Sequence, residues 1–313
     1  MLTRLLANRR EAVAAKALSS IEKTCVHLLS EAGSANTAAL ATMIMDAYAQ
    51  LPKSSRIAFF NFLDQALRPD ATQVLQAATA YAENSDAANV LALQRVVDPP
   101  RQELLRRING AAGGTAAIIG MRRDLLNFLP HAPQLRAVDS DFRHLLSSWF
   151  NPGFLVLRQI DWNSPAVLLE EIIRQEAVHA IKDWSDLRRR LQPDRRCFAF
   201  FHPQLPDKPL IFVEVALVRS IPRAIDHLIN DGLENSPVRD ARVAAFYSIS
   251  SCEPGLSGVS LGNFLIKRVA ELLQVQVPTL RRFCTLSPVP SLRKWMTREP
   301  ADDDANLARE RAG

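Results

Sequence analysis

The spacing of apolar residues changes once along this chain, at Asn151-Pro152-Gly153, and that change restricts the possible folds. Residues 2–149 carry apolar side chains at spacings of three and four, as helices do, and contain no convincing alternation with period two. Strand-like runs follow the change, at residues 154–160, 196–201, 210–218, 241–250 and 282–286. The sequence therefore predicts a helical bundle in residues 1–150 and a mixed α/β domain in residues 151–313.

Helices are also predicted between the strands of the second half. Ser164 is placed to cap a helix that has Pro165 at its first position and runs to about residue 178. A second helix is predicted over residues 261–273. Its apolar residues recur on one face, namely Leu261, Leu265, Val269 and Leu272. The tail after Trp295 is polar and charged, so no packed structure is predicted for it.

Length and composition indicate an ordinary two-domain globular protein. The chain has 313 residues, of which 48% are apolar and 23% charged. Its net charge of +5 suits a small phosphate-bearing ligand but is too small to indicate nucleic-acid binding. No run reaches the roughly 18 apolar residues of a membrane helix, so no membrane partner is expected. The Arg-rich residues 1–20 resemble a transit peptide in composition, but Glu11 and the alanines favour a first surface helix.

Cysteine and histidine spacing predicts no metal site. The cysteines lie far apart, without a histidine at zinc-finger spacing, so reduced thiols are expected in a cytoplasmic protein. The six histidines form no ligand spacing among themselves. The sequence also lacks the motifs of serine hydrolases, zinc proteases and P-loop kinases, which argues against those activities.

The clearest local signal for a ligand site lies where the strand predicted at residues 241–250 leads through a glycine-containing loop into the next helix. The loop residues are Ser257, Gly258, Val259, Ser260, Leu261, Gly262 and Asn263. Amide N–H groups at a helix N-terminus have no partner within the helix, and glycine lets a ligand approach the backbone closely. The loop is therefore predicted to bind a diphosphate. The alternative is a tight turn without a ligand, since the Gly-x-Gly-x-x-Gly order of dinucleotide-binding proteins is absent.

Ser287 follows the strand predicted at residues 282–286 and precedes Pro288 and Pro290. Strand ends are where α/β sheets place ligand sites, and the prolines would hold the serine on stiff backbone near the glycine loop. Ser287 is therefore a candidate catalytic residue. The alternative is a serine that only caps a turn.

Several segments taken together resemble the malonyl-CoA decarboxylase family. They are residues 101–107, 113–115, 176–179, 194–198, 209–217, 246–250, 262–267 and 285–290, of which the last three are the most specific. The resemblance covers almost the whole chain up to Trp295. It implies an N-terminal helical oligomerisation domain in residues 1–150. For residues 151–313 it implies a CoA-binding domain with a fold like that of GCN5-related acetyltransferases, incomplete at its C-terminal end.

The resemblance also implies a function. Members of this family are carboxy-lyases of fatty acid metabolism that convert malonyl-CoA to acetyl-CoA and carbon dioxide without a metal or organic cofactor. By similarity the malonyl-CoA contacts fall on residues 257–263, and the active-site serine falls on Ser287. Some relatives carry an acidic residue where this chain has Ser260, so a contact through that carboxylate would be absent. The resemblance further implies a homo-oligomer, a tetramer.

One departure from the family leaves alternatives open. The catalytic histidine of the family lies in an Arg-Phe-His-Leu-like motif beyond the position of Trp295, and this sequence contains no such motif. The proton donor is therefore unassigned, and the C-terminal end is expected to be short relative to the family. The alternatives are a CoA-binding or oligomerising remnant without turnover and an acyltransferase that uses the same CoA site.

Overall fold

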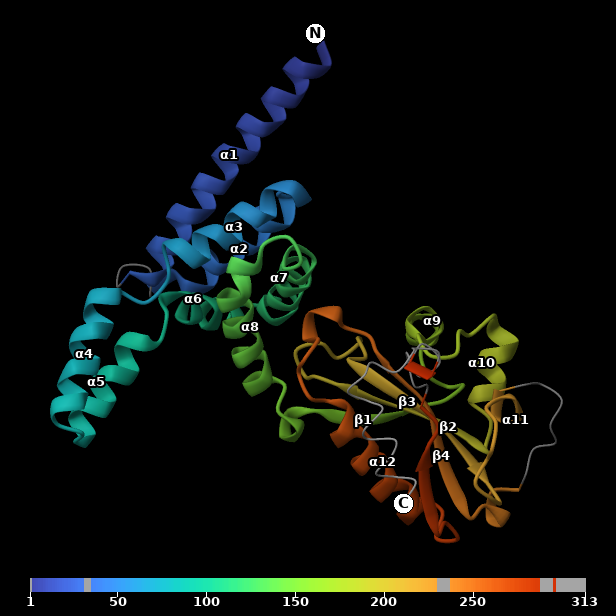
Figure 1. Cartoon of the computed structure of the whole chain (residues 1–313). Coiled ribbons are helices and arrows are strands. Elements are labelled where there is room, and N and C mark those ends of the chain that lie inside the picture. Colours follow the sequence, from blue (N-terminus) through green and yellow to red (C-terminus); the bar gives the residue numbers. More distant parts are fainter. Residues whose placement is uncertain (1, 31–34, 230–236, 288–294, 297–313) are drawn as a thin grey trace.

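The first half of the chain is helical throughout its described part. The computed structural model describes residues 2–30, 35–229, 237–287 and 295–296. The helices are α1 (Leu2–Leu29), α2 (Thr37–Gln50), α3 (Lys53–Gln65), α4 (Ala71–Glu83), α5 (Ala87–Val97), α6 (Pro100–Asn109), α7 (Gly114–Phe128) and α8 (Arg136–Trp149) (Figure 1). Most of them pack around one apolar core, in which Phe59, Phe60 and Phe142 are fully buried. The predicted helical N-terminal half is confirmed.

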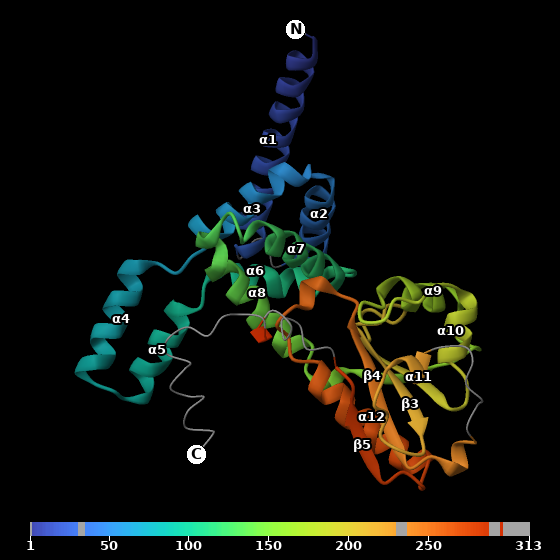
Figure 2. The ribbon, with the colours of Figure 1, turned by 45° about the vertical axis from the view of Figure 1, so that its right-hand side comes forward.

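Helices α4 and α5 form a hairpin that extends away from this core (Figures 1 and 2). Asp70 and Asp86 cap the two helices, but neither helix contains a buried residue. Leu75 and Leu91 are 70% and 53% exposed. The apolar spacing correctly indicated helices here, but it did not indicate that these two lie outside the common core.

The second half is a mixed α/β domain, as predicted, and helices lie on both faces of its sheet. Its strands are β1 (Val156–Ile160), β2 (Arg195–Phe201), β3 (Ile211–Val218), β4 (Val243–Ser251) and β5 (Arg282–Thr285), in the order β1-β2-β3-β4-β5. The first four strands run antiparallel to their neighbours, and β5 runs parallel to β4. Helix α12 (Gly262–Gln276) covers one face (Figures 1 and 2). Helices α9 (Ala166–Gln175), α10 (Trp184–Arg190) and α11 (Asp226–Ile229) lie on the other.

The central strands are apolar on both faces because helices cover both. In β3, Val213 and Val215 join the core beneath α12, whereas Phe212 belongs to the cluster beneath α9. All residues of β3 except Val218 are buried. Apart from Glu214, the residues of this strand are all apolar, which is why its boundaries could be predicted to within one residue.

Three helix details differ from the sequence prediction. Pro165, not Ser164, directly precedes α9, and the Ser164 hydroxyl accepts a hydrogen bond from the backbone of the preceding turn instead. Helix α9 also ends at Gln175, three residues before the predicted end. In α12, Leu273 rather than Leu272 completes the fully buried stripe, because it continues the spacing of four that relates the earlier buried residues.

The two halves are joined through the short helix η5 (Pro254–Leu256), which packs against α7. Arg122 of α7 is 2% exposed and donates to Asp139 of α8 at 2.9 Å and to the carbonyl oxygen of Gly255 at 2.8 Å. Gly255 lies so close to the backbone of Ile119 that a side chain there would clash. The loop that follows β4 is therefore fixed to the helical half.

Candidate functional site

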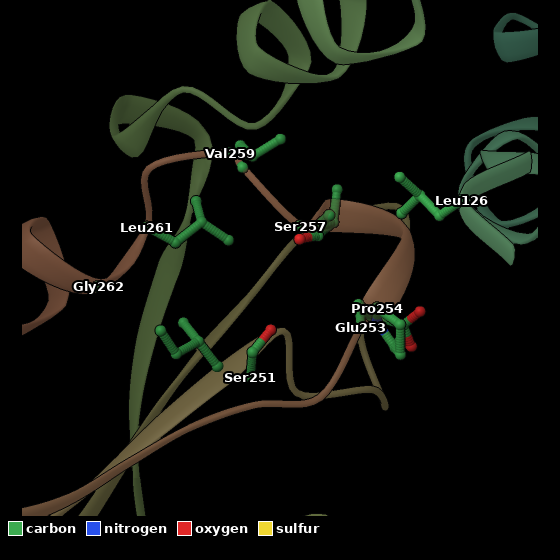
Figure 3. Close-up of a pocket in the computed structure, with 11 residues that line it drawn as sticks. Leu126, Ser251, Glu253, Pro254, Ser257, Val259, Leu261 and Gly262 are labelled. Carbon is green, nitrogen blue, oxygen red and sulfur yellow. The ribbon is translucent and has the colours of Figure 1, made fainter. Parts of the chain in front are cut away.

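A pocket of about 570 Å³ lies beside the predicted glycine loop (Figure 3). Its lining residues are Leu126, Ile211, Ser251, Glu253, Pro254, Leu256, Ser257, Gly258, Val259, Leu261 and Gly262. The pocket thus combines the end of β4, the beginning of β3, the turn before α12 and one residue of α7. Five of the seven predicted loop residues line it, while Ser260 and Asn263 are exposed and do not.

Gly258 and Gly262 have different roles in this turn. Gly258 has φ of +79°, which residues with a Cβ adopt only with strain, and a Cβ there would lie 3.4 Å from Cδ of Arg143. Gly262 begins α12 with an ordinary φ, and a Cβ there would lie 3.7 Å from Cδ1 of Ile211. Gly258 is needed for the fold of the turn, whereas Gly262 is not. Glycine at position 262 instead leaves the backbone open to the pocket.

Among the described residues, no side chain caps the N-terminus of α12. Leu261 occupies the position before the helix and makes no side-chain cap. The first N–H groups of a helix have no acceptor within the helix, and their partial positive charge attracts anions. Leu261 and Gly262 also line the pocket, so these amides lie at its wall. This arrangement can bind a phosphate or diphosphate.

Two cationic side chains lie near the pocket. Arg143 of α8 is exposed, runs beside Gly258, and makes no ion pair with the described residues. Lys208 forms an ion pair with Glu253, a buried residue of the pocket wall. Because the Lys208 ammonium offsets the Glu253 carboxylate, the wall does not repel an anion there. No pattern in the sequence singled out Arg143, which comes from the other half of the chain.

Ser287 is exposed and does not line this pocket. The N–H of Leu286 donates to the carbonyl oxygen of Phe246 at 2.8 Å, so the register of β4 and β5, continued by two residues, aligns Ser287 with Ser248. That level is three residues, or about 10 Å, from the end of β4 at the pocket. Beyond Phe246, this edge of β4 has no strand partner among the described residues. Pro288 and Pro290 lie outside the described residues.

Ser248 is held by a carboxylate from the end of α9. Its hydroxyl donates to Glu176 at 2.7 Å, and the Ser250 hydroxyl donates to the same carboxylate at 3.1 Å. Glu176 also accepts the backbone N–H groups of Val178 and His179 at 2.9 and 2.8 Å. Because Ser248 gives its proton to Glu176, its oxygen can accept one further hydrogen bond. The sequence did not single out Glu176 or Ser248 for any role.

A buried ion pair lies on the same face of the sheet. Arg190 of α10 donates to Glu214 of β3 at 2.9 Å, and both side chains are almost fully buried. Burial raises the pKa of Glu214 to about 8, although Arg190 acts in the opposite direction. Burial likewise raises the pKa of Tyr247, whose hydroxyl has no hydrogen-bond partner among the described residues. These groups do not line the pocket beside the glycine loop.

Neither a metal site nor a membrane span is found in the part of the chain that the structure describes. No three histidine, cysteine or acidic side chains gather there in a way that could hold a metal ion. No described helix is both long and apolar enough to cross a bilayer.

Sequence families and curated relatives point to one family. The malonyl-CoA decarboxylase N-terminal domain matches residues 67–150, and the malonyl-CoA decarboxylase C-terminal domain matches residues 153–312. The chain is 38% identical over 204 residues to the mitochondrial malonyl-CoA decarboxylase of Anser anser anser, covering 63% of this chain and 40% of that protein. It is also 38% identical over 210 residues to the mitochondrial enzyme of Rattus norvegicus, covering 65% and 43%. The chain thus spans about two fifths of the length of these curated relatives.

Solved structures agree with these matches. The malonyl-CoA decarboxylase from Rhodopseudomonas palustris superimposes with a TM-score of 0.83 and 46% identity, covering 94% of this chain and 73% of that one. The malonyl-CoA decarboxylase from Agrobacterium vitis gives a TM-score of 0.85 and 46% identity, covering 92% and 72%. The similarity therefore extends over both the helical half and the sheet.

Proposed function

Because this chain belongs to the malonyl-CoA decarboxylase family, we propose that it converts malonyl-CoA to acetyl-CoA and carbon dioxide. The observation that carries the proposal is the pocket at the turn before α12. There Gly262 leaves the first amides of the helix accessible, and the exposed side chain of Arg143 lies beside the same turn. We also propose the predicted contact run as the substrate-binding segment, namely Ser257, Gly258, Val259, Ser260, Leu261, Gly262 and Asn263. A role in fatty acid metabolism follows from this substrate.

In this proposal the diphosphate of coenzyme A binds at the N-terminus of α12. The amides of its first turn donate to phosphate oxygens, and the partial positive charge of the helix end favours the anion. Arg143 adds a guanidinium, which can bind a phosphate through two parallel hydrogen bonds. The wall at Glu253 does not oppose binding because Lys208 is paired with it.

The acyl arm of coenzyme A would then follow the edge of β4 that has no strand partner among the described residues. Backbone N–H and C=O groups on a sheet edge can pair with an extended ligand, and the arm of coenzyme A contains amide groups. This edge lies between the pocket and the level of Ser287. A ligand bound along it directs its thioester end toward Ser287.

We propose Ser287 as the catalytic residue. Decarboxylation breaks the bond between the carboxyl carbon and the α carbon, and the electron pair moves onto the thioester as an enolate, which is then protonated at carbon. The Ser287 hydroxyl donates a hydrogen bond to the malonyl carboxylate or the developing enolate oxygen and orients the group for cleavage. Its exposure supports this role, because the hydroxyl is open to a ligand.

The direct test is release of labelled carbon dioxide from malonyl-CoA that carries the label in its free carboxyl group. We expect release by the full chain, together with coenzyme A binding measured by calorimetry. Coenzyme A binding without release would support the alternative of a remnant without turnover. Acyl transfer to an amine in place of release would support the acyltransferase alternative.

Arg143 provides a sharper test of the binding site. Changing Arg143 to Gln should raise the KM for malonyl-CoA severalfold and leave kcat almost unchanged, because the guanidinium contacts phosphate and not the reacting carbon. Arg136 is the matched control, since it is an exposed arginine about two turns away on the same helix. An equal effect of Arg136→Gln would mean that general charge, and not the site, determines KM.

We further propose a two-domain organisation, a helical oligomerisation domain in residues 1–150 and a CoA-binding domain in residues 151–313, in a cytoplasmic homo-tetramer. The arm formed by α4 and α5 supports self-association, because it exposes apolar side chains and buries none. Light scattering coupled to gel filtration should give a mass above that of one chain. Changing Leu75 and Leu91 to Ser should lower that mass, and an unchanged mass would exclude the arm as the interface.

A further inference from the structure

Three arginines stand side by side where β3 ends and where β4 and β5 begin. The register of the sheet, continued by one residue beyond Val218 and Val243, aligns Arg219, Arg242 and Arg281 across three neighbouring chain segments. Backbone hydrogen bonds hold this alignment. The N–H of Arg242 donates to the carbonyl oxygen of Val218 at 2.9 Å, and the N–H of Arg281 donates to that of Arg242 at 2.8 Å. Neighbouring strands lie about 4.8 Å apart, so the three residues are close neighbours.

These arginines line a common pocket. Arg219, Ser220, Arg242, Arg281 and Arg282 border a cavity of about 380 Å³. An adjoining cavity of about 390 Å³ shares Arg219 and Ser220 with it. The cavity volume is that of a small-molecule site, and its charged lining comes from all three segments.

Positive charge in this region exceeds negative charge. The described residues 218–229, 237–243 and 280–282 contain six arginines and two aspartates. Of the two aspartates, only Asp240 forms an ion pair within the described part of the chain, with Arg219 at 2.6 Å, and both of these side chains are exposed. In the described part of the chain, the guanidinium groups of Arg281 and Arg282 make no hydrogen bond or ion pair.

Such a row is unfavourable without a ligand, since like charges on directly opposite residues of neighbouring strands repel each other. A bound anion would remove the repulsion, and guanidinium groups bind phosphate oxygens in pairs. We propose that this pocket binds a small polyanion with two or more phosphate groups. The pocket lies at the opposite end of β4 from the turn before α12, about 27 Å away along the strand, so it is a separate site.

The test is a calorimetric titration of the full chain with inorganic triphosphate at low ionic strength, in the presence of saturating coenzyme A. The coenzyme occupies the turn before α12, so a remaining site reports the arginine pocket. We expect one triphosphate per chain. The double variant Arg281→Gln/Arg282→Gln should weaken binding about tenfold or more, because it removes two guanidinium groups. Arg95→Gln, which removes an exposed arginine of α5, should leave the affinity unchanged.

A second titration uses ATP in place of triphosphate. Equal affinities mean that the pocket recognises the phosphate chain alone, and tighter binding of ATP means that the ligand is a nucleotide; both outcomes support the site. The double variant identifies the pocket independently of coenzyme A, so the test remains valid if the chain does not bind coenzyme A.

Three results would overturn the proposal. The first is the absence of triphosphate binding at low ionic strength. The second is the same affinity in the double variant as in the unchanged protein. The third is a lower Tm of the ligand-free double variant: removal of unneutralised like charges should raise the Tm, so a fall would assign these arginines a structural role.

Discussion

Replacing Gly262 with alanine should separate ligand binding from folding. Gly262 begins α12 with an ordinary φ, and the nearest contact of an added Cβ would be Cδ1 of Ile211 at 3.7 Å, which is normal van der Waals contact. The substitution therefore introduces neither strain nor a clash. Because alanine favours a helix by up to about 1 kcal/mol over glycine, the free energy of unfolding should stay the same or rise by at most that amount.

Binding should respond in the opposite direction. The added methyl group would lie at the pocket wall, where we propose that the diphosphate approaches the first amides of α12. Loss of one hydrogen bond to a charged phosphate costs about 1.5–3 kcal/mol. Since 1.4 kcal/mol is a factor of about ten, the Kd for coenzyme A should rise roughly 10- to 150-fold. Calorimetric titration with coenzyme A, together with urea unfolding of the same preparations, measures both quantities.

The matched control is Gly120→Ala in the middle of α7. There an added Cβ would approach only the end of the Arg123 side chain, at 3.9 Å. This variant should gain similar helix stability and keep the Kd of the unchanged protein. If Gly262→Ala is folded and binds coenzyme A as tightly as the unchanged protein, the diphosphate does not contact this turn. Gly258→Ala is a less informative change, because its φ of +79° adds about 1–2 kcal/mol of strain.

Three further changes test other parts of the account. Ser287→Ala should lower kcat for carbon dioxide release about tenfold or more and leave coenzyme A affinity unchanged; unchanged turnover would refute the catalytic role. Arg122→Met leaves Asp139 without its buried partner and should cost about 3–5 kcal/mol in urea unfolding, and a loss below about 1 kcal/mol would contradict the junction described above. Glu214 has an ordinary pKa of 4.5 and a folded pKa of about 8, so the folded state retains a proton that the unfolded state has lost. Its contribution to the free energy of unfolding is therefore complete below pH 4.5 and is lost as the pH rises through about 8. In unfolding curves measured at several pH values, Glu214→Gln should remove this decrease in the free energy of unfolding.

The elements with strong apolar periodicity were predictable, and the contacts between distant segments were not. The strand β3 was predicted within one residue because both of its faces are buried. Helix α10 was missed, because its seven residues are too few to show a helical period. Leu126 and Arg143 lie at the site only because α7 and α8 pack against the loop after β4. The sequence does not contain that packing in any local pattern.

The contact between Glu176 and Ser248 could not be predicted from the sequence either. Both residues lie within the segments that resembled the family, yet no spacing in the sequence connects them, since 72 residues separate them. Their hydrogen bond depends on α9 ending at Gln175 over the face of the sheet that carries Ser248. The sequence prediction extended that helix to residue 178, which would have kept Glu176 within the helix. This error of three residues at the end of α9 therefore prevented prediction of the buried hydrogen bond between Glu176 and Ser248.

The length of β5 connects the fold to the proposed chemistry. β5 pairs only with the first residues of β4, up to Phe246, and β4 continues for five more residues to Ser251 at the pocket. A longer β5 would occupy those backbone groups and separate the pocket from Ser287 by a paired strand. Because β5 ends at Thr285, the edge of β4 between the level of Ser287 and the turn before α12 has no strand partner among the described residues. In the proposed binding mode, the short β5 leaves room for a ligand to contact both the helix amides and Ser287.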